Sequence, residues 1–134
     1  MSVTELEHVL VLSDDIDRSR SFYERALGLK PGARPQLPFR GYWLYAGATA
    51  CLHIADRESY RMHAQTLGLQ VAERHAGPGP VDHIAFNGSD YESFVDRLTE
   101  LGINPVRNEV PSGGPRQLFF DDPDGLRVEV NVKP

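Results

Sequence analysis

The sequence predicts an α+β fold in which two βαβββ modules form a cupped mixed β-sheet with the helices on the outside. The stretch that begins at Glu7, EHVLVLSDDIDRSRSFYERALGL, and the stretch that begins at Asp82, DHIAFNGSDYESFVDRLTELGI, follow one order. Each has an acidic residue and a histidine in an apolar run, a polar break, a helical stretch with a central Phe, and a Leu-Gly pair. Three further extended segments follow each stretch, so the chain is read as one module present twice.

The length and composition favour one globular domain that covers residues 1–134. Hydrophobic residues make up 40% of the 134 residues and charged residues 25%, which is enough apolar surface for a core without disulfides. No stretch approaches the roughly 18 to 20 consecutive apolar residues of a membrane span. We therefore expect one domain whose modules, at about 5–55 and 81–132, are joined by a linker at 56–80.

Charge and cysteine content restrict the partners and the compartment. The formal net charge of -5 and the pI near 5.5, with basic residues spread along the chain, argue against a nucleic-acid partner. The N-terminus, MSVTELEH, lacks the basic start and apolar stretch of a secretory signal, and the single Cys51 cannot form an internal disulfide. We therefore expect a cytoplasmic protein with neither a nucleic-acid nor a membrane partner.

The first module opens with the segment LEHVLVL at 6–12, whose β-branched and apolar residues are typical of a buried strand. Side-chain oxygens of residues 13–15 can cap the helix that follows. That helix is expected to run to Leu27, and Gly28 is a typical left-handed helix end. Three extended segments complete the module, at 29–36, 40–46 and 49–55.

The second module repeats this order. The segment VDHIAFN at 81–87 is the expected first strand, and either Ser89 or Asp90 can cap the next helix. This helix is expected to run to Leu101 and to end at Gly102. Its three further strands are expected near 103–108, at 116–121 and at 126–132, and the last two are joined by the turn DDPDG at 121–125.

Four residues of metal-binding type fall at equivalent positions of the two modules. His8 and His83 lie in the first strands, 75 positions apart, and His53 and Glu129 lie in the last strands, 76 positions apart. Side chains alternate along a strand, so His53 and Glu129 are each expected to point away from their apolar neighbours and toward a concave polar face. If the modules are related by a pseudo-two-fold axis, the four side chains converge.

Three imidazoles and one carboxylate on strands are a suitable ligand set for a divalent transition metal. We predict one divalent metal ion per site, held by His8, His83, Glu129 and His53. The candidate ions are Fe, Mn, Ni, Co and Zn, because imidazole and carboxylate suit all of them. A subset of two histidines and one carboxylate leaves coordination positions open for substrate.

Each of these residues could also have a purely structural role instead of binding a metal ion. A single histidine in a strand is more often a hydrogen-bonded, half-buried residue than a ligand, and the pairing between modules is what favours ligation. Cys51 is expected to be a small core residue. His63 and His75, in the linker, are expected at the surface, and the acids of DDPDG are explained by the turn alone.

Four segments together resemble the vicinal oxygen chelate superfamily: EHVLVLSDDIDRSRSFYERALGL, LHIADRE, DHIAF and FFDDPDGLRVEVNV. This superfamily includes glyoxalase I, fosfomycin-resistance thiol transferases, methylmalonyl-CoA epimerase, type I extradiol dioxygenases and bleomycin-resistance proteins. The resemblance covers essentially the whole chain. The Phe-x-Asp-Pro-Asp-Gly-x-x-x-Glu ending is fairly specific to the superfamily, but it does not specify a reaction.

The resemblance also implies roles for the four residues. His8, His83 and Glu129 match the three recurrent ligand positions of the superfamily. The fourth position, His53 in this chain, is a Glu in glyoxalase I and a Gln in the epimerase, and extradiol dioxygenases have a catalytic histidine in the corresponding region. The resemblance therefore implies His53 and Glu129 as catalytic residues, and it leaves His53 as either a fourth ligand or an acid/base.

The function that the resemblance implies is that of a metal-dependent lyase, isomerase or epimerase of the glyoxalase type. Its small substrate would be chelated through two neighbouring oxygens, with the ion as Lewis acid. The alternatives are an Fe(II) extradiol-type ring-cleaving dioxygenase and a non-catalytic drug-binding protein of the bleomycin-resistance type. The resemblance also implies a homodimer, in which each site is formed within one chain or from halves of different chains.

Overall fold

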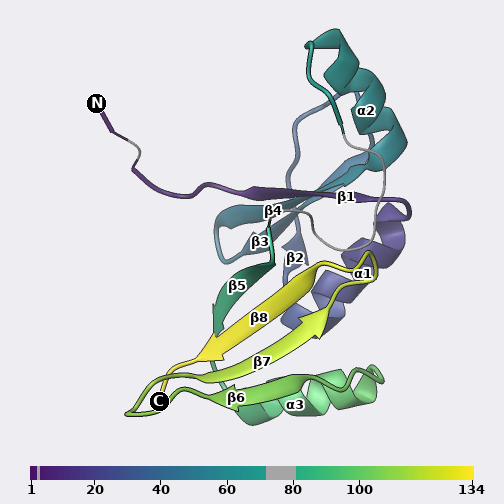
Figure 1. Ribbon diagram of the computed structural model, residues 1–134. Coiled ribbons are helices and arrows are strands. Elements are labelled where there is room, and N and C mark those ends of the chain that lie inside the picture. The colour runs from purple at the N-terminus through teal and green to yellow at the C-terminus, as the bar shows by residue number, and fades with distance from the viewer. Residues whose placement is uncertain (3, 72–80) are drawn as a thin grey trace. The chain divides into compact units, whose positions relative to one another are not determined.

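The computed structural model describes residues 1–2, 4–71 and 81–134, and Figure 1 shows its helices and strands. The contacts between residues divide the chain into two compact units. The first unit comprises Met1–Glu24 and Gly28–Glu73, and the second comprises Arg25–Leu27 and Arg74–Pro134.

The first βαβββ module contains one helix and four strands: β1 (Val9–Ser13), α1 (Ile16–Leu27), β2 (Lys30–Pro31), β3 (Gly41–Ala46) and β4 (Thr49–Asp56). Its strands form one mixed sheet in the order β1-β4-β3-β2 (Figure 1). The pairing of β1 with β4 is parallel, and the other two pairings are antiparallel. A further helix, α2 (Arg57–Thr66), follows directly after β4.

The second βαβββ module has the same order of elements: β5 (His83–Gly88), α3 (Tyr91–Glu100), β6 (Val106–Glu109), β7 (Arg116–Asp121) and β8 (Arg127–Val132). Its sheet has the order β5-β8-β7-β6. The pairing of β5 with β8 is parallel and the other two are antiparallel, as in the first module. The two sheets therefore have the same topology, which confirms the predicted duplication.

Helix α1 covers one face of the first sheet. Its N-cap is Asp15, whose carboxylate accepts a hydrogen bond from a backbone N–H in the first turn, and Gly28 ends the helix with a φ of 72°. Tyr42 of β3 donates its hydroxyl to Asp17 of the helix, and the guanidinium of Arg20 lies 4.5 Å from the centroid of the same ring. The helix therefore packs on the face that carries Tyr42.

Helix α3 covers one face of the second sheet, as Figure 1 shows. Its N-cap Asp90 accepts a hydrogen bond from the backbone N–H of Ser93, at 3.2 Å. At Gly88, near the end of β5, an added Cβ would lie 2.6 Å from the ring of Phe94 on α3 and 3.0 Å from Val130 on β8. The absence of a side chain at this position allows the helix to approach the face that carries Val130.

Aliphatic side chains of the strands form the apolar core of each module. Burial of each such side chain contributes roughly 1.5 to 3 kcal/mol to folding. The most deeply buried strand residues are Leu44, Leu52 and Ile54 in the first module and Leu118, Val128 and Val130 in the second. This distribution confirms the alternation predicted for β4 and β8, in which aliphatic side chains face a helix and the functional candidates face the opposite side.

The α+β class, the two mixed sheets and the helices on their outer faces are confirmed. Several predicted boundaries were wrong by a few residues. Strand β1 begins at Val9, so that His8 precedes it, and β2 comprises only Lys30–Pro31, although the backbone N–H of Gly32 still donates to the carbonyl oxygen of Trp43 at 3.2 Å. Strand β6 begins at Val106, three residues later than predicted.

The predicted linker at 56–80 is only partly described. Helix α2 occupies residues 57–66, and residues 72–80, with His75 and the Gly-Pro run, lie outside the described part of the chain. No helix among the described residues is both long enough and apolar enough to cross a membrane.

Candidate functional site

In the first module, His53 lies between two aromatic rings. Its imidazole is stacked on that of His8, with ring centroids 3.8 Å apart and an interplanar angle of 12°. The indole of Trp43 is also stacked on His53, at 4.1 Å and 10°. Trp43 is the cross-strand partner of His53 in the pairing of β3 with β4. The three rings form the His8–His53–Trp43 stack.

The surroundings of His53 determine the tautomer and the charge of its ring. The residue is buried, with 6% of its surface exposed, and its Nε2 lies 3.1 Å from the carbonyl oxygen of Ala50. Because a carbonyl can only accept, Nε2 carries the proton and Nδ1 holds the lone pair of the neutral ring. Burial, followed by the nearby His8, lowers the pKa of His53 below its ordinary value. The ring is therefore neutral at pH 7.

His8 is held by a different contact. Its Nδ1 lies 2.9 Å from a carboxylate oxygen of Glu7, the preceding residue. The carboxylate can only accept a hydrogen bond, so Nδ1 donates and Nε2 keeps its lone pair in the neutral ring. The side chain of His8 is 35% exposed, and Glu7 is largely exposed.

In the second module, His83 and Glu129 form the matching pair. His83 Nε2 lies 3.7 Å from Glu129 Oε1. Glu129 is buried, although it carries a carboxylate, and His83 is more open, with 38% of its side chain exposed. A nitrogen lone pair and a carboxylate oxygen are thus directed to the same region of the open sheet face.

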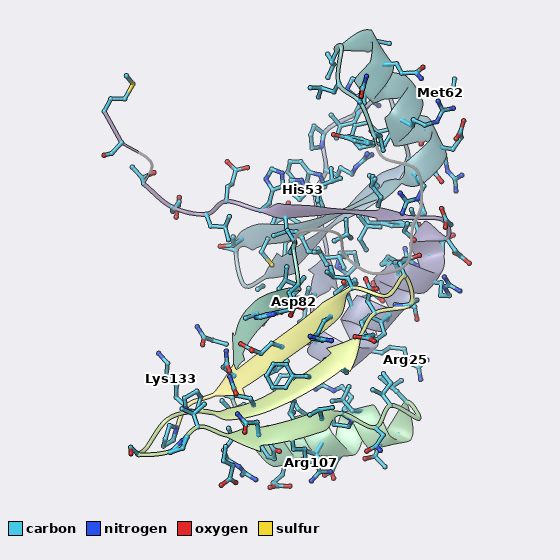
Figure 2. All side chains as sticks on the ribbon, viewed as in Figure 1. Arg25, His53, Met62, Asp82, Arg107 and Lys133 are labelled. Carbon is cyan, nitrogen blue, oxygen red and sulfur yellow. The ribbon has the colours of Figure 1, made fainter. Side chains whose placement is uncertain are left out.

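The contact between the acid and the histidine is repeated in the second module. Asp82 Oδ2 lies 2.8 Å from His83 Nδ1, so that His83 also keeps its lone pair on Nε2. Arg127 Nη1 donates to Asp82 at 3.1 Å. The hydrogen bond from His83, followed by the charge of Arg127, lowers the pKa of Asp82. Figure 2 labels Asp82 beside β5 and His53 in the first module.

A side-chain amide orients the carboxylate of Glu129. Asn131, two residues further along β8, donates Nδ2–H to Glu129 Oε2 at 2.7 Å. The other oxygen, Oε1, faces His83. The carboxylate therefore has one oxygen held by the protein and one directed to the histidine.

The sheet register explains why the same positions are used twice. His53 is paired with Leu10 of β1, two residues after His8, and Glu129 is paired with Ala85 of β5, two residues after His83. On the other side, His53 is paired with Trp43, and Glu129 with its equivalent, Phe119. Each module therefore places one donor directly before its first strand or at the start of it, and one on its last strand, on the same open face.

The two pairs differ in how they fit a metal ion. Two donors that each lie about 2.0 to 2.2 Å from one ion are roughly 3.0 to 4.2 Å apart. The separation of 3.7 Å between His83 Nε2 and Glu129 Oε1 falls within this range. Imidazole lone pairs lie in the ring plane, so the stacked rings of His8 and His53 cannot both bind one ion in this arrangement. One of these two residues fits a ligand role.

The structure brings the four predicted residues together as two pairs, one in each unit. Among the described residues, no group of three or more His, Cys, Asp or Glu side chains that could hold an ion is found. The convergence of His8, His53, His83 and Glu129 on one ion therefore stays a prediction.

Sequence reasoning missed several neighbours of these pairs. The acidic residue before each histidine is visible in the repeated stretches, but its contact with Nδ1 was not predicted. Trp43 was not identified as a neighbour of His53, although its spacing of 76 from Phe119 equals that of His53 from Glu129. The role of Asn131 could have been found from alternation, which places it on the same face as Glu129.

The remaining candidates have structural roles. Cys51 is half-buried, and its thiol lies 4.0 Å from the carbonyl oxygen of Leu44. His63 on α2 is half-buried against Phe39, with ring centroids 5.3 Å apart, and is therefore less exposed than predicted. In the DDPDG turn, Asp122 accepts hydrogen bonds from two backbone N–H groups of the turn, which supports the structural reading of this motif.

Two βαβββ modules that each hold a donor pair on the open face define a class of duplicated α+β proteins. The sequence profile of the Glyoxalase/Bleomycin resistance protein/Dioxygenase superfamily matches residues 5–130. The chain belongs to this superfamily.

Three similar proteins illustrate the range of the superfamily. Glyoxylase I 4 of Arabidopsis thaliana is 34% identical over 134 residues, which cover 97% of this chain and 71% of the relative. Biphenyl-2,3-diol 1,2-dioxygenase 2 of Rhodococcus globerulus is 25% identical over 91 residues, 66% of this chain and 48% of the relative. The crystal structure of a lactoylglutathione lyase from Agrobacterium tumefaciens has the same fold, with a TM-score of 0.73, 20% identity and coverage of 98% and 95% of the two chains.

Proposed function

We propose that this protein is a divalent-metal-dependent enzyme that acts on a small substrate chelated through two neighbouring oxygens, as a lyase, isomerase or epimerase. The observation that carries the proposal is the repeated contact between an acid and a histidine. Glu7 and Asp82 bind Nδ1 of His8 and His83, and each ring therefore keeps its lone pair on Nε2. A carboxylate behind a histidine is a common arrangement at metal sites, because it fixes the tautomer and the ring orientation.

We assign His8, His83 and Glu129 as the metal ligands. His83 and Glu129 have a donor separation that fits one ion. Only one of His8 and His53 fits a ligand role while their rings are stacked, and His8 is the one that repeats the carboxylate contact of His83. The resulting set of two histidines and one carboxylate leaves coordination positions for substrate oxygens.

We assign His53 as the acid/base. The bound ion would supply Lewis acidity, which stabilises negative charge on the chelated oxygens. His53 then takes a proton at Nδ1 from the carbon next to those oxygens and returns it in the second half of the reaction. The lowered pKa keeps the ring neutral and ready to accept this proton at pH 7. Trp43 and the carbonyl of Ala50 hold the ring plane and the Nε2–H in place.

The proposed ligand set draws on both modules, either of one chain or of two subunits of a homodimer. Mixing of two inactive variants distinguishes these arrangements. If each site combines two subunits, a dimer of one His8→Gln chain and one Glu129→Gln chain contains one intact site and regains bound metal. If each site lies within one chain, every site of that dimer carries a defect and no metal returns.

The proposal is tested by metal content and thermal stability. We expect protein purified without chelator to contain one divalent ion per site, measured by elemental analysis, and added ion to raise the melting temperature. His83→Ala should abolish both effects, whereas His63→Ala, a matched change on α2, should preserve them. Wild-type protein that neither contains a divalent ion nor gains stability from one would contradict the proposal and favour a metal-free binding protein.

An extradiol-type dioxygenase is the second candidate, because a relative with that name aligns with two thirds of the chain. The same two histidines and carboxylate suit Fe(II). Oxygen uptake on catechols that requires iron would identify the dioxygenase. Conversion of methylglyoxal and glutathione to lactoylglutathione, without oxygen uptake, would identify the glyoxalase reaction.

A further inference from the structure

Three side-chain amides lie in a row across the second sheet. Asn108 on β6 is the register partner of Gln117 on β7, and Gln117 is the register partner of Asn131 on β8. Asn108 Nδ2 donates to Gln117 Oε1 at 2.7 Å, and Gln117 Nε2 donates to Asn131 Oδ1 at 3.0 Å. Asn131 Nδ2 donates to Glu129 Oε2 at 2.7 Å. This row is the Asn108–Gln117–Asn131 amide chain.

The amide chain has one direction. Each amide donates an N–H toward Glu129, and both Gln117 and Asn131 accept at the oxygen of the same group. Aligned hydrogen bonds of this kind polarise one another, so each bond is strengthened by the one behind it. The last N–H meets a buried carboxylate, where a bond to a charged acceptor is strongest.

The first module shows that this sheet does not need such a row for its fold. The positions equivalent to Gln117 and Asn131 are Gly41 and Ala55, which pair with each other in the same register. No side chain can stand at Gly41, because an added Cβ would lie 2.1 Å from the backbone oxygen of Ile54. The amides are therefore present only in the module that carries the Glu129 carboxylate, and the module fold itself does not require them.

We propose that the Asn108–Gln117–Asn131 amide chain is a positioning device for Glu129, which fixes one carboxylate oxygen so that the other is held toward His83. The inference rests on the proposed metal site. A carboxylate at the end of a Glu side chain rotates about its last bond unless an oxygen is fixed. Asn131 fixes Oε2, Gln117 fixes the orientation of the Asn131 amide, and Asn108 fixes that of Gln117.

The test compares Co²⁺ affinity, by calorimetric titration, across graded variants. Asn131→Leu keeps the size of the side chain and removes the donor, and it should weaken Co²⁺ binding roughly 10- to 100-fold, as loss of an outer hydrogen-bond partner does. Gln117→Met should weaken Co²⁺ binding less, because the amide of Asn131 is still present but can rotate. Asn108→Ala should weaken Co²⁺ binding least, since Asn108 acts on Glu129 only through the other two amides.

Gln117→Glu separates positioning from charge. A carboxylate at this position cannot donate, so Asn131 must turn its N–H₂ toward it and present Oδ1 to Glu129. Positioning therefore predicts weaker Co²⁺ binding in this variant, whereas the added negative charge alone predicts tighter binding. Gln65→Met, at an exposed glutamine on α2, is the matched control and should bind Co²⁺ as wild type does.

A second readout uses metal-free protein. In wild type, NMR should show the side-chain N–H₂ of Asn131 protected from exchange with water, and Gln117→Met should shift its resonances while the melting temperature stays near that of wild type. Unchanged Co²⁺ affinity in Asn131→Leu, tighter binding in Gln117→Glu, or an unprotected Asn131 amide would overturn the inference. Failure of wild type to bind Co²⁺ would instead overturn the proposed metal site. In that case the NMR measurement still tests whether the amide chain fixes the side chain of Asn131.

Discussion

The two modules of this protein have one topology but hold their candidate functional side chains by different means. In the first module, the candidate residue on the last strand is an imidazole fixed by ring stacking and one backbone carbonyl. In the second, the equivalent residue is a carboxylate fixed by a chain of amides. Duplication therefore sets the position of the donor side chain in each module. The neighbouring side chains determine whether that donor is suited to proton transfer or to metal binding.

The largest expected effect comes from exchanging the two equivalent residues for the same uncharged amide. Glu129→Gln should weaken metal binding by more than the roughly 10- to 100-fold that loss of an outer partner costs, because a charged ligand is removed. His53→Gln should leave metal content near that of wild type and lower turnover roughly 10²- to 10⁴-fold, as loss of an acid/base does. Elemental analysis and steady-state kinetics on both variants measure this. Loss of the ion in His53→Gln would show that this histidine is a ligand.

The next effect compares the apolar cores of the two modules. Leu52 and Val128 occupy equivalent positions and are fully buried. Leu52→Ala should lower the free energy of unfolding by about 2 to 5 kcal/mol, because it leaves a cavity between the sheet and its helix. Val128→Ala removes fewer atoms and should cost less. Urea unfolding of both variants measures the difference, and equal costs would mean that the two cores are not packed alike.

The pH dependence of stability should come from the first module. The pKa of His53 is lowered in the folded protein, so the unfolded chain binds a proton at a higher pH than the folded chain does. Stability is therefore complete above the ordinary histidine pKa of about 6.5 and falls as the pH falls toward the lowered pKa. In His53→Gln this decline should be smaller, as measured by urea unfolding of metal-free protein from pH 7.5 to pH 5. The same decline in both proteins would exclude His53 as its source.

The smallest expected effect distinguishes the two equivalent helix caps. Asp15 caps α1 with a φ of -142°, whereas Asp90 caps α3 with a φ of 62°. Glycine adopts the positive φ without strain. In Asp90→Gly this relief should offset part of the free energy lost with the capping hydrogen bond. Asp15→Gly lacks this compensation and should be the more destabilising change, by roughly a few tenths of a kcal/mol. Thermal unfolding measures the difference, and a greater loss in Asp90→Gly would contradict the account.

The repeated order of elements was predictable because hydrophobic alternation, helix caps and glycine stops occur twice in the sequence. Gly28 and Asp15 act as predicted, and the boundaries that were wrong include the start of β1 and the limits of β2 and β6. Such shifts depend on ladder hydrogen bonds between strands, which one strand's sequence does not specify.

The sequence identified four candidate residues, which the structure brings together as two pairs, but it did not identify their local geometry. The matching spacings between the two modules predicted that His53 and Glu129 lie on the last strands, where the structure has them. Ring stacking on Trp43 depends on the register between β3 and β4, and the bond from Asn131 depends on rotamers, so neither was accessible from sequence spacing. The stacking of His8 on His53 changes the interpretation of His53 most, because two stacked imidazoles cannot both bind one ion.

Trp43 is the only tryptophan in the chain, and its indole lies flat against His53. The intrinsic fluorescence of the unlabelled protein therefore originates beside the proposed proton-transfer group. Protonation of that imidazole, or its departure from the indole, changes the emission, and substrate arrival can be followed in a stopped-flow instrument without an added dye. The molecule thus contains its own optical reporter at the position where the chemistry is proposed.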